Sequence, residues 1–315
     1  MEAPPRKHRR GPAARIGRMA RMDVGVTDPE RVGEERLPDG RPLGWAEWGP
    51  PDGVPVLFSP GAGTSRHLGF GADAVAALGV RLIALDRPGL GASAPSPGRT
   101  FADFAEDVRA FAAARGLGRP AMVGNSQGAP FALACAARGA VSALAVVSGA
   151  DEIADPRFAD ALPEELRRLV GTAVADPAAA ERIFTGFTPR AMADMVLAGS
   201  PECDLAVYRH PAFAAAWQRA LEEGFAQGPG GYARDTALVM GRWGRWGLNL
   251  ARIAVPVDLW YGAEDTSHSP DQGASLASRI PGAVRRTVPG IGGAVLWTHA
   301  EEILGTLLER IGTAR

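Results

Sequence analysis

The chain has 315 residues, of which 46% are hydrophobic and 22% charged, and its formal net charge is −1. This composition is typical of a globular protein with a large core, and it excludes a disordered chain or one that binds nucleic acid through a large positive charge. No apolar run approaches the length of a membrane span, and the two cysteines, Cys135 and Cys203, lack the spacing of metal ligands. We therefore expect a cytoplasmic protein with no membrane or nucleic-acid partner.

The first 31 residues are basic and include Lys7, the only lysine of the chain. No apolar segment follows the charges, so this stretch does not have the form of a secretory signal. A basic tail can contact nucleic acid or anionic lipid, but no basic pattern continues beyond it. We expect residues 1–31 to be a disordered tail.

Beyond the tail, short apolar runs alternate with helical patterns. Strands are predicted at 55–59, 80–86, 120–125, 142–149, 256–262 and 283–288, after an antiparallel hairpin allowed by residues 36–48. Helices are predicted near 67–78, 101–115, 127–138, 270–279 and 298–311. This alternation indicates an α/β fold in which a mostly parallel, doubly wound sheet is covered by helices on both faces.

Residues 151–250 interrupt the alternation with several helical patterns and no convincing strand. An insertion of that length between two strands is too long for a loop. We predict a helical cap there, on a core formed by residues 32–150 and 251–315. Trp243 and Trp246 either line a pocket or pack the cap onto the core.

A candidate nucleophile stands in the segment Gly-Asn-Ser-Gln-Gly (124–128), between a predicted strand and a predicted helix. A sharp strand-to-helix turn projects the hydroxyl of its central serine above the sheet, and small residues two positions away on each side allow that turn. The pattern alone also occurs by chance. Its position between strand and helix makes Ser126 our candidate.

A second candidate element is the Gly-rich segment Ser-Pro-Gly-Ala-Gly-Thr-Ser-Arg (59–66), which follows the strand at 55–59. A loop at this place can aim a backbone N–H at a reacting carbonyl oxygen, and a plain turn is the alternative. We expect the N–H groups of Ala62 and of Gln127, the residue after the serine, to form an oxyanion hole.

Together these segments resemble the α/β-hydrolases, in particular capped, proline-iminopeptidase- and esterase-like members of the actinobacterial type. The resemblance spans about residues 36–311 and also includes the segments at 82–93, 257–270 and 289–304. It implies an α/β-hydrolase fold with an inserted helical cap. It further implies Ser126 as nucleophile, Asp265 as the acid of a catalytic triad, and Ala62 and Gln127 as oxyanion donors.

The chain departs from the family pattern at two places. The usual His-Gly of the oxyanion loop is Pro60-Gly61, which alters the support of the loop but leaves a backbone donor. The position of the family's base histidine is occupied by Gly293. A triad is defined by geometry and not by chain order, so another histidine can supply the base.

His268 is the strongest candidate among the five histidines, because it follows Asp265 by three residues. Ser269, Pro270 and Gln272 have the pattern of a capping box, which predicts a helix starting at about residue 270 and leaves His268 on the preceding loop. We expect His268 to accept the proton of the serine while Asp265, or a carboxylate such as Asp151, orients its other nitrogen. The alternative is a histidine that only hydrogen-bonds its loop.

The other four histidines have more ordinary explanations. His8 belongs to the tail, and His67 follows the oxyanion loop at a predicted helix start. His210 lies in the predicted cap, where it serves structure or touches substrate. His299 begins the last helix and is expected at the surface.

Three functions remain open from the sequence. The first is a serine hydrolase of a small or medium ester, lactone or related acyl substrate, which requires a histidine within hydrogen-bonding distance of Ser126. The second is a non-hydrolytic lyase or cyclase, in which His268 lies nearer to substrate than to the serine. The third is an inactive, ligand-binding pseudohydrolase with no histidine near the serine. No metal or organic cofactor is expected, since the Gly-rich loops lack both GxGxxG and a P-loop lysine; the expected partner is a small-molecule substrate, and the oligomeric state is left open.

Overall fold

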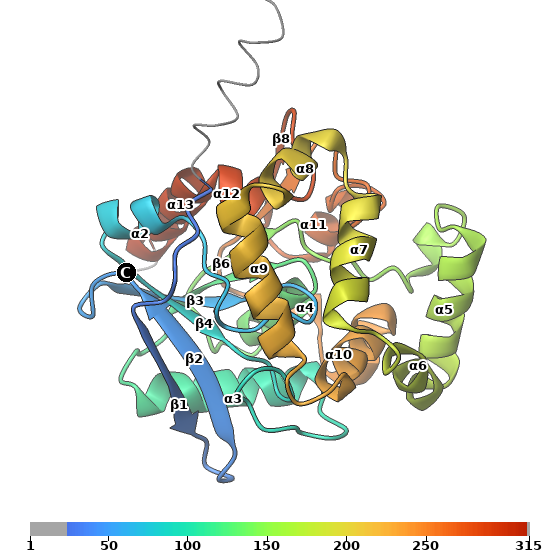
Figure 1. Ribbon diagram of the computed structural model, residues 1–315, viewed down its shortest axis with the longest axis horizontal. Helices are drawn as coiled ribbons and strands as arrows, with labels where there is room; N and C mark the ends of the chain where they lie inside the picture. Colours follow the sequence, from blue (N-terminus) through green and yellow to red (C-terminus); the bar gives the residue numbers. More distant parts are fainter. Residues whose placement is uncertain (1–23, 314–315) are drawn as a thin grey trace, which may run out of the picture.

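The computed structural model describes residues 24–313, and its core is one eight-stranded sheet in the order β1-β2-β4-β3-β5-β6-β7-β8 (Figure 1). The first strand pairs antiparallel with the second, the second pairs antiparallel with the fourth, and the other neighbours are parallel. The strands are β1 (Arg31–Arg36), β2 (Pro42–Trp48), β3 (Val54–Ser59), β4 (Val80–Leu85), β5 (Ala121–Asn125), β6 (Leu144–Val147), β7 (Val257–Gly262) and β8 (Val284–Val288). The predicted mostly parallel sheet is confirmed. The leading antiparallel hairpin is present, but it starts at Arg31 and not at residue 36.

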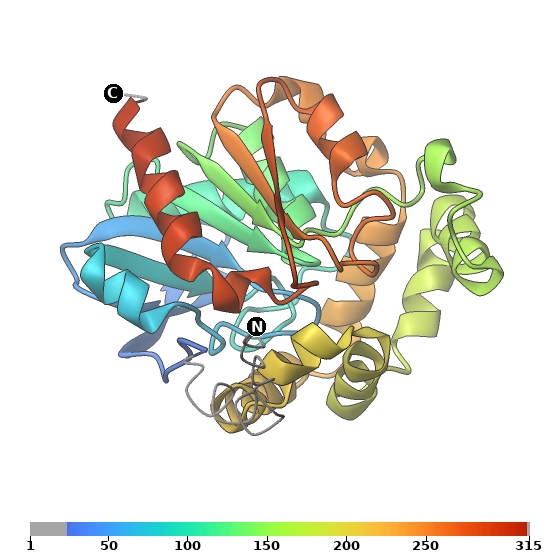
Figure 2. The ribbon, with the colours of Figure 1, turned by 90° about the horizontal axis from the view of Figure 1, so that it is seen from above.

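Helices cover both faces of the sheet (Figure 2). The covering helices are α2 (Ala72–Ala77), α3 (Phe101–Ala114), α4 (Gly128–Ala137), α11 (Ala274–Arg279), α12 (Val295–Thr298) and α13 (Ala300–Thr313). Alternate residues of a strand enter different hydrophobic clusters: Leu57 packs with α3 and α4, whereas Val56 and Phe58 pack with α2, α12 and α13. Successive side chains of a strand point to opposite faces, so a strand between two helical layers is apolar throughout.

The interval between β6 and β7, in which every residue is described, contains helices and their connecting loops but no strand. They are α5 (Glu164–Ala175), α6 (Pro177–Phe184), α7 (Pro189–Gly199), α8 (Glu202–Tyr208), α9 (Pro211–Gly224) and α10 (Gly230–Met240), with the short 3-10 helices η1 (Pro156–Phe158), η2 (Trp243–Trp246) and η3 (Leu250–Arg252). Figures 1 and 2 show them gathered along one side of the molecule. Trp243 is 1% exposed and packs edge-on against Phe101 of α3, so it joins these helices to the core.

Two sequence predictions need correction here. Residues 1–23 of the predicted tail lie outside the described residues, but the rest of it is ordered: Val24 is buried against the core, and Arg31 begins β1. The predicted helix at 270–279 begins only at Ala274, because Gly273 before it has a φ of 75°. The side chain of Gln272 therefore closes no capping box and donates to the carbonyl of Ala263 instead.

Candidate active site

Ser126 stands at a sharp turn between β5 and α4, where its φ is 50°. A non-glycine residue with positive φ is strained, and such strain collects at functional sites. The flanking glycines permit the turn. A Cβ on Gly124 would lie 2.7 Å from the Cβ of Ala132, and one on Gly128 would lie 2.1 Å from the carbonyl oxygen of Ser59. The backbone thus has the form expected of a nucleophile elbow.

His268 connects Ser126 with Asp265. Its Nε2 lies 3.1 Å from the Oγ of Ser126, and its Nδ1 lies 3.0 Å from each carboxylate oxygen of Asp265. When Nδ1 carries the proton and donates a hydrogen bond to the carboxylate, Nε2 is left to accept a hydrogen bond from the serine hydroxyl. The three predicted triad residues are therefore brought together in one hydrogen-bonded chain.

The charges of this pair reinforce each other. Burial raises the pKa of the Asp265 carboxyl, but the positive charge of His268 and hydrogen bonds from His268 and Ser267 outweigh it and lower the pKa to about 2. Burial lowers the pKa of His268, but the charge and hydrogen bond of Asp265, with the charge of Asp204, raise the pKa above its usual range. The site thus stabilises an ionised carboxylate beside a histidine that binds a proton readily.

The alternative orienting carboxylate, Asp151, is used elsewhere. It accepts hydrogen bonds from Arg279 at 2.8 Å and from the hydroxyl of Ser269 at 3.0 Å. Its own backbone N–H donates to the carbonyl of His268 at 3.0 Å. Asp151 therefore supports the loop that carries the imidazole, and Asp265 orients the ring.

The other described histidines make contacts away from the serine. The ring of His299 contacts the hydroxyl of Thr298 at 2.9 Å. The ring of His67 pairs with Glu223 of α9, and His210 precedes α9 as its N-cap residue. Among the histidines of residues 24–313, His268 is the one whose ring is hydrogen-bonded to Ser126.

Gly293 provides the space in which the His268 ring lies. A Cβ added to Gly293 would come within 2.7 Å of the Cε1 of His268, closer than real Cβ contacts allow. Position 293 thus carries no side chain, and the ring of His268 lies against it. The ring has this space because residue 293 is a glycine.

Asp204 of α8 binds the loop at this position. Its carboxylate accepts the backbone N–H groups of Gly292 at 2.9 Å, Gly293 at 2.6 Å and Ala294 at 3.3 Å. Asp204 is 1% exposed, and sequence reasoning missed it. The only sequence signal is an acidic residue in a helical segment, which does not reveal a partner almost ninety residues away.

The predicted oxyanion donors flank the serine. A Cβ on Gly61, the residue before Ala62, would lie 3.5 Å from the Cβ of Ser126, so this loop runs beside the elbow. Gln127 follows the serine directly and is the N-cap residue of α4, whose N-terminus favours negative charge. Among the hydrogen bonds of residues 24–313, none has the backbone N–H of Ala62 or Gln127 as its donor. Neither group is therefore committed to an acceptor within the described residues.

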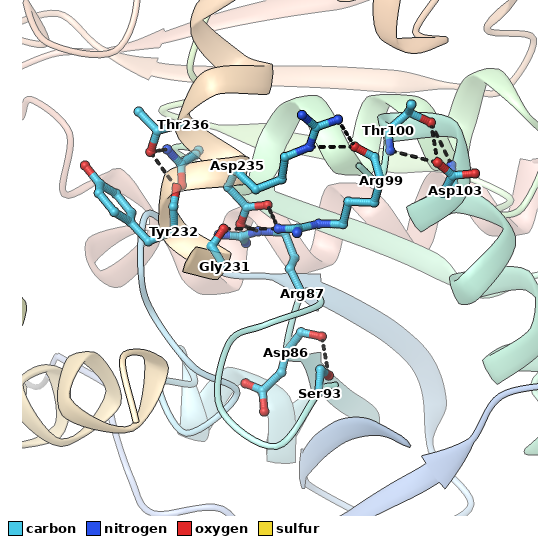
Figure 3. A network of polar contacts seen from close by, with 12 residues as sticks. Asp86, Arg87, Ser93, Arg99, Thr100, Asp103, Gly231, Tyr232, Asp235 and Thr236 are labelled. Atoms are coloured by element: carbon cyan, nitrogen blue, oxygen red, sulfur yellow. Dashed lines mark hydrogen bonds and ion pairs between the residues drawn. The ribbon is translucent and has the colours of Figure 1, made fainter. Parts of the chain in front are cut away.

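A buried arginine, Arg87, contacts the loop that carries Ala62. Figure 3 shows its side chain beside Asp235. Its guanidinium donates to the carbonyls of Pro60 at 2.5 Å and Gly61 at 2.9 Å, and to Asp235 of α10 at 2.7 Å. Arg99 pairs with the other oxygen of Asp235. The sequence motif around Arg87 contributed to the family resemblance, but no role for the arginine was predicted from it.

Other chemistry finds little support in the described part of the chain. Burial raises the pKa of the Cys135 thiol and also that of Cys203, which makes both poor nucleophiles. Within residues 24–313 no three His, Cys, Asp or Glu side chains are grouped as metal ligands. No helix in the same range has the length and apolarity needed to cross a membrane.

A mostly parallel sheet with a strained serine after its central strand defines the class of α/β-hydrolases. The sequence model of the alpha/beta hydrolase fold family matches residues 54–300. The chain therefore belongs to this family, and the predicted fold class is confirmed.

Solved structures agree with the fold. A hydrolase from Pseudomonas aeruginosa PA01 is 21% identical with a TM-score of 0.65, and the match covers 89% of this chain and 98% of that one. The enol-lactonase from Burkholderia xenovorans LB400 is 20% identical with a TM-score of 0.63, covering 89% and 100%. An esterase from Rhodococcus sp. ECU1013 is 22% identical with a TM-score of 0.61, covering 90% and 99%. A search of curated proteins gives no match.

Proposed function

We propose that the protein is a serine hydrolase of a small or medium ester, lactone or related acyl substrate. The observation that carries the proposal is the hydrogen-bonded chain from Ser126 through His268 to Asp265. The esterase and enol-lactonase among the similar structures support ester or lactone hydrolysis as the general class. The proposal includes the finer assignment to the capped, proline-iminopeptidase- and esterase-like type.

In the proposed first half-reaction, the Oγ of Ser126 bonds to the substrate carbonyl carbon while Nε2 of His268 takes the hydroxyl proton. The carbonyl oxygen gains the negative charge, which the N–H groups of Ala62 and Gln127 stabilise. The tetrahedral intermediate then expels the alkoxide, which takes the proton from His268. In a lactone this alcohol remains attached to the acyl chain.

In the second half-reaction, water attacks the acyl-enzyme and gives its proton to His268. The same imidazole returns that proton to Ser126 as the acid product leaves. Asp265 keeps the ring in the productive tautomer in both halves and stabilises the imidazolium. Its low pKa means that it stays ionised at neutral pH.

The geometry favours this reading over the two alternatives. A lyase or cyclase would use His268 on the substrate and not on the serine, but the imidazole is aligned with Oγ at 3.1 Å. A binding pseudohydrolase would have no reason to keep a base beside a strained serine. The proposal therefore rests on a relocated base and not on the scaffold alone.

The test is hydrolysis of a panel of p-nitrophenyl esters and γ- and δ-lactones, with products identified by mass spectrometry. We expect saturable release of acid and alcohol by the wild type and a loss of about 10⁴-fold or more in kcat for Ser126→Ala. A folded wild type that hydrolyses none of them, or a Ser126→Ala variant as active as the wild type, would contradict the proposal.

A further inference from the structure

Arg87 fixes the orientation of one peptide group beside the serine. The carbonyl of Gly61 and the N–H of Ala62 belong to the same peptide bond, and no described peptide bond is cis. In a planar trans peptide, these two groups point in opposite directions. Arg87 holds the Gly61 carbonyl at 2.9 Å, so the N–H of Ala62 must point away from the guanidinium.

The arginine is itself fixed from the inserted helices. Arg87 and Asp235 are both fully buried, and Nε of Arg87 donates to Asp235 at 2.7 Å. A buried cation is tolerated only when it is paired and hydrogen-bonded, and here Asp235 supplies the charge while the loop carbonyls accept the other N–H groups. The guanidinium also lies 5.1 Å from the ring centroid of Phe131 in α4. This packing leaves it little freedom to move.

Thr236, the residue after Asp235 in α10, contacts Gln127, the second proposed oxyanion donor. The side-chain amide of Gln127 donates to the hydroxyl of Thr236 at 2.9 Å, and that hydroxyl donates to the carbonyl of Tyr232. Figure 3 shows Asp235 and Thr236 on adjacent positions of the same helix. One helical turn therefore contacts Gln127 directly and reaches the peptide bond between Gly61 and Ala62 through Arg87.

We propose that Arg87, held by Asp235, is a positioning residue that orients the oxyanion loop, and that α10 thereby aligns both donors. The inference rests on the proposed hydrolytic function. Pro60 stands where the family usually has a histidine, and its ring has no N–H with which to support the loop. The fork of Arg87 supplies that support, by binding the two successive carbonyls of Pro60 and Gly61.

The test compares Arg87→Lys with Arg99→Lys. Both arginines are buried and pair with Asp235, but only Arg87 touches the loop. Lysine keeps the charge beside Asp235 but lacks the planar fork that binds two carbonyls. We expect Arg87→Lys to lower kcat and the rate of fluorophosphonate inactivation by about 10- to 100-fold, with KM within about 3-fold, because the loss of a whole oxyanion donor costs about 10²–10³. For Arg99→Lys we expect less than about 3-fold.

A second readout does not depend on turnover. In ¹H–¹⁵N spectra, the amide signal of Ala62 should move in Arg87→Lys and stay in place in Arg99→Lys. Thr236→Val keeps the side-chain shape and should move the Gln127 signal, with a kcat about 3- to 10-fold lower. If Arg87→Lys does not fold, Asp235→Asn takes its place, since it keeps an acceptor for Arg87 but removes the charge that fixes it.

The outcomes separate this inference from the proposed function. Equal kinetic effects in the two lysine variants, or an unmoved Ala62 amide in Arg87→Lys, would overturn the positioning role. A wild type without hydrolysis or labelling would contradict the hydrolase proposal. In that case the Ala62 signal still decides whether Arg87 orients the loop.

Discussion

The nucleophile side and the base side of the site are built in different ways. Around Ser126 the constraint lies in the backbone: a φ of 50° and two glycines that leave no room for a side chain. Around His268 the requirement falls on the side chain: its ring must lie within hydrogen-bonding distance of one partner at each nitrogen. The resemblance to the family predicts the usual elbow around Ser126 and a departure on the base side at Gly293.

This difference teaches which part of a catalytic site is free to move along the chain. A strained turn needs a particular strand, helix and pair of glycines, so it cannot be rebuilt elsewhere by one substitution. An imidazole can arrive from any loop at the same edge of the sheet, and the loop after β7 already carries Asp265. The following predictions test this contrast, starting with the largest effect.

Asp265→Asn should lower kcat by about 10⁴-fold, because the orienting carboxylate no longer selects the productive tautomer. The dependence of kcat/KM on pH shows in which direction the carboxylate shifts the pKa of His268. Neutral His268 is the active form, and its pKa is raised, so wild-type kcat/KM should rise with pH through an inflection above about 6.5. Without the negative charge, that inflection should move to lower pH. Profiles of kcat/KM between pH 5 and 9 check this, and an unmoved inflection would assign the titration to another group.

Gly293→Ala should lower kcat by about 10²-fold or more, since its methyl group would displace the ring of His268. The double variant His268→Gly with Gly293→His moves the base to the position at which the family resemblance predicts it. We expect it to recover at least about 10-fold over His268→Gly alone. Steady-state assays with one ester check both results. A Gly293→Ala enzyme with wild-type kcat would show that this space is not needed.

Gly128→Ala should destabilise the elbow by about 1–3 kcal/mol or more, because its Cβ would overlap the carbonyl of Ser59. Gly305 is the matched control: it lies inside α13, and nothing beyond its chain neighbours and the backbone of its own helix lies within 4 Å of an added Cβ. Gly305→Ala should stabilise the protein by about 0.5–1 kcal/mol through helix propensity. Urea unfolding of the two variants measures the difference, and equal free energies of unfolding would contradict the packing argument.

Asp204→Asn should have the smallest effect, a loss of about 10-fold or less in kcat with a modest loss of stability. An amide has one acceptor oxygen, so it cannot accept all three N–H groups of the Gly292–Ala294 loop. The exposed Glu202 in the first turn of the same helix provides the control variant Glu202→Gln. If both variants behave alike in thermal unfolding and turnover, Asp204 does not fix this loop.

The sequence predicted what depends on local patterns. The strands and the elbow follow from apolar runs and glycine spacing, and His268 was suggested by its closeness in the chain to Asp265. The start of α11 was predicted wrongly, because a capping pattern does not reveal that Gly273 adopts a positive φ just before the helix.

The missed residues share a physical reason. Arg87 and Asp235 are 148 positions apart, and Asp204 binds a loop 88 to 90 positions away. Contacts between residues so far apart in the chain depend on how the inserted helices pack on the core. Neither the hydrophobic periodicity nor a local motif of a single sequence reveals that packing. The residues that support the site could therefore not be predicted from the sequence, whereas the reacting residues could.

The most direct measurement of the central claim is the rate of fluorophosphonate labelling of wild type, Ser126→Ala, His268→Ala and His299→Ala, all shown to be folded by circular dichroism. We predict rapid labelling of the wild type and of His299→Ala, no labelling of Ser126→Ala, and a loss of several orders of magnitude in His268→Ala. Labelling of His268→Ala at the wild-type rate would contradict a base relocated to this loop.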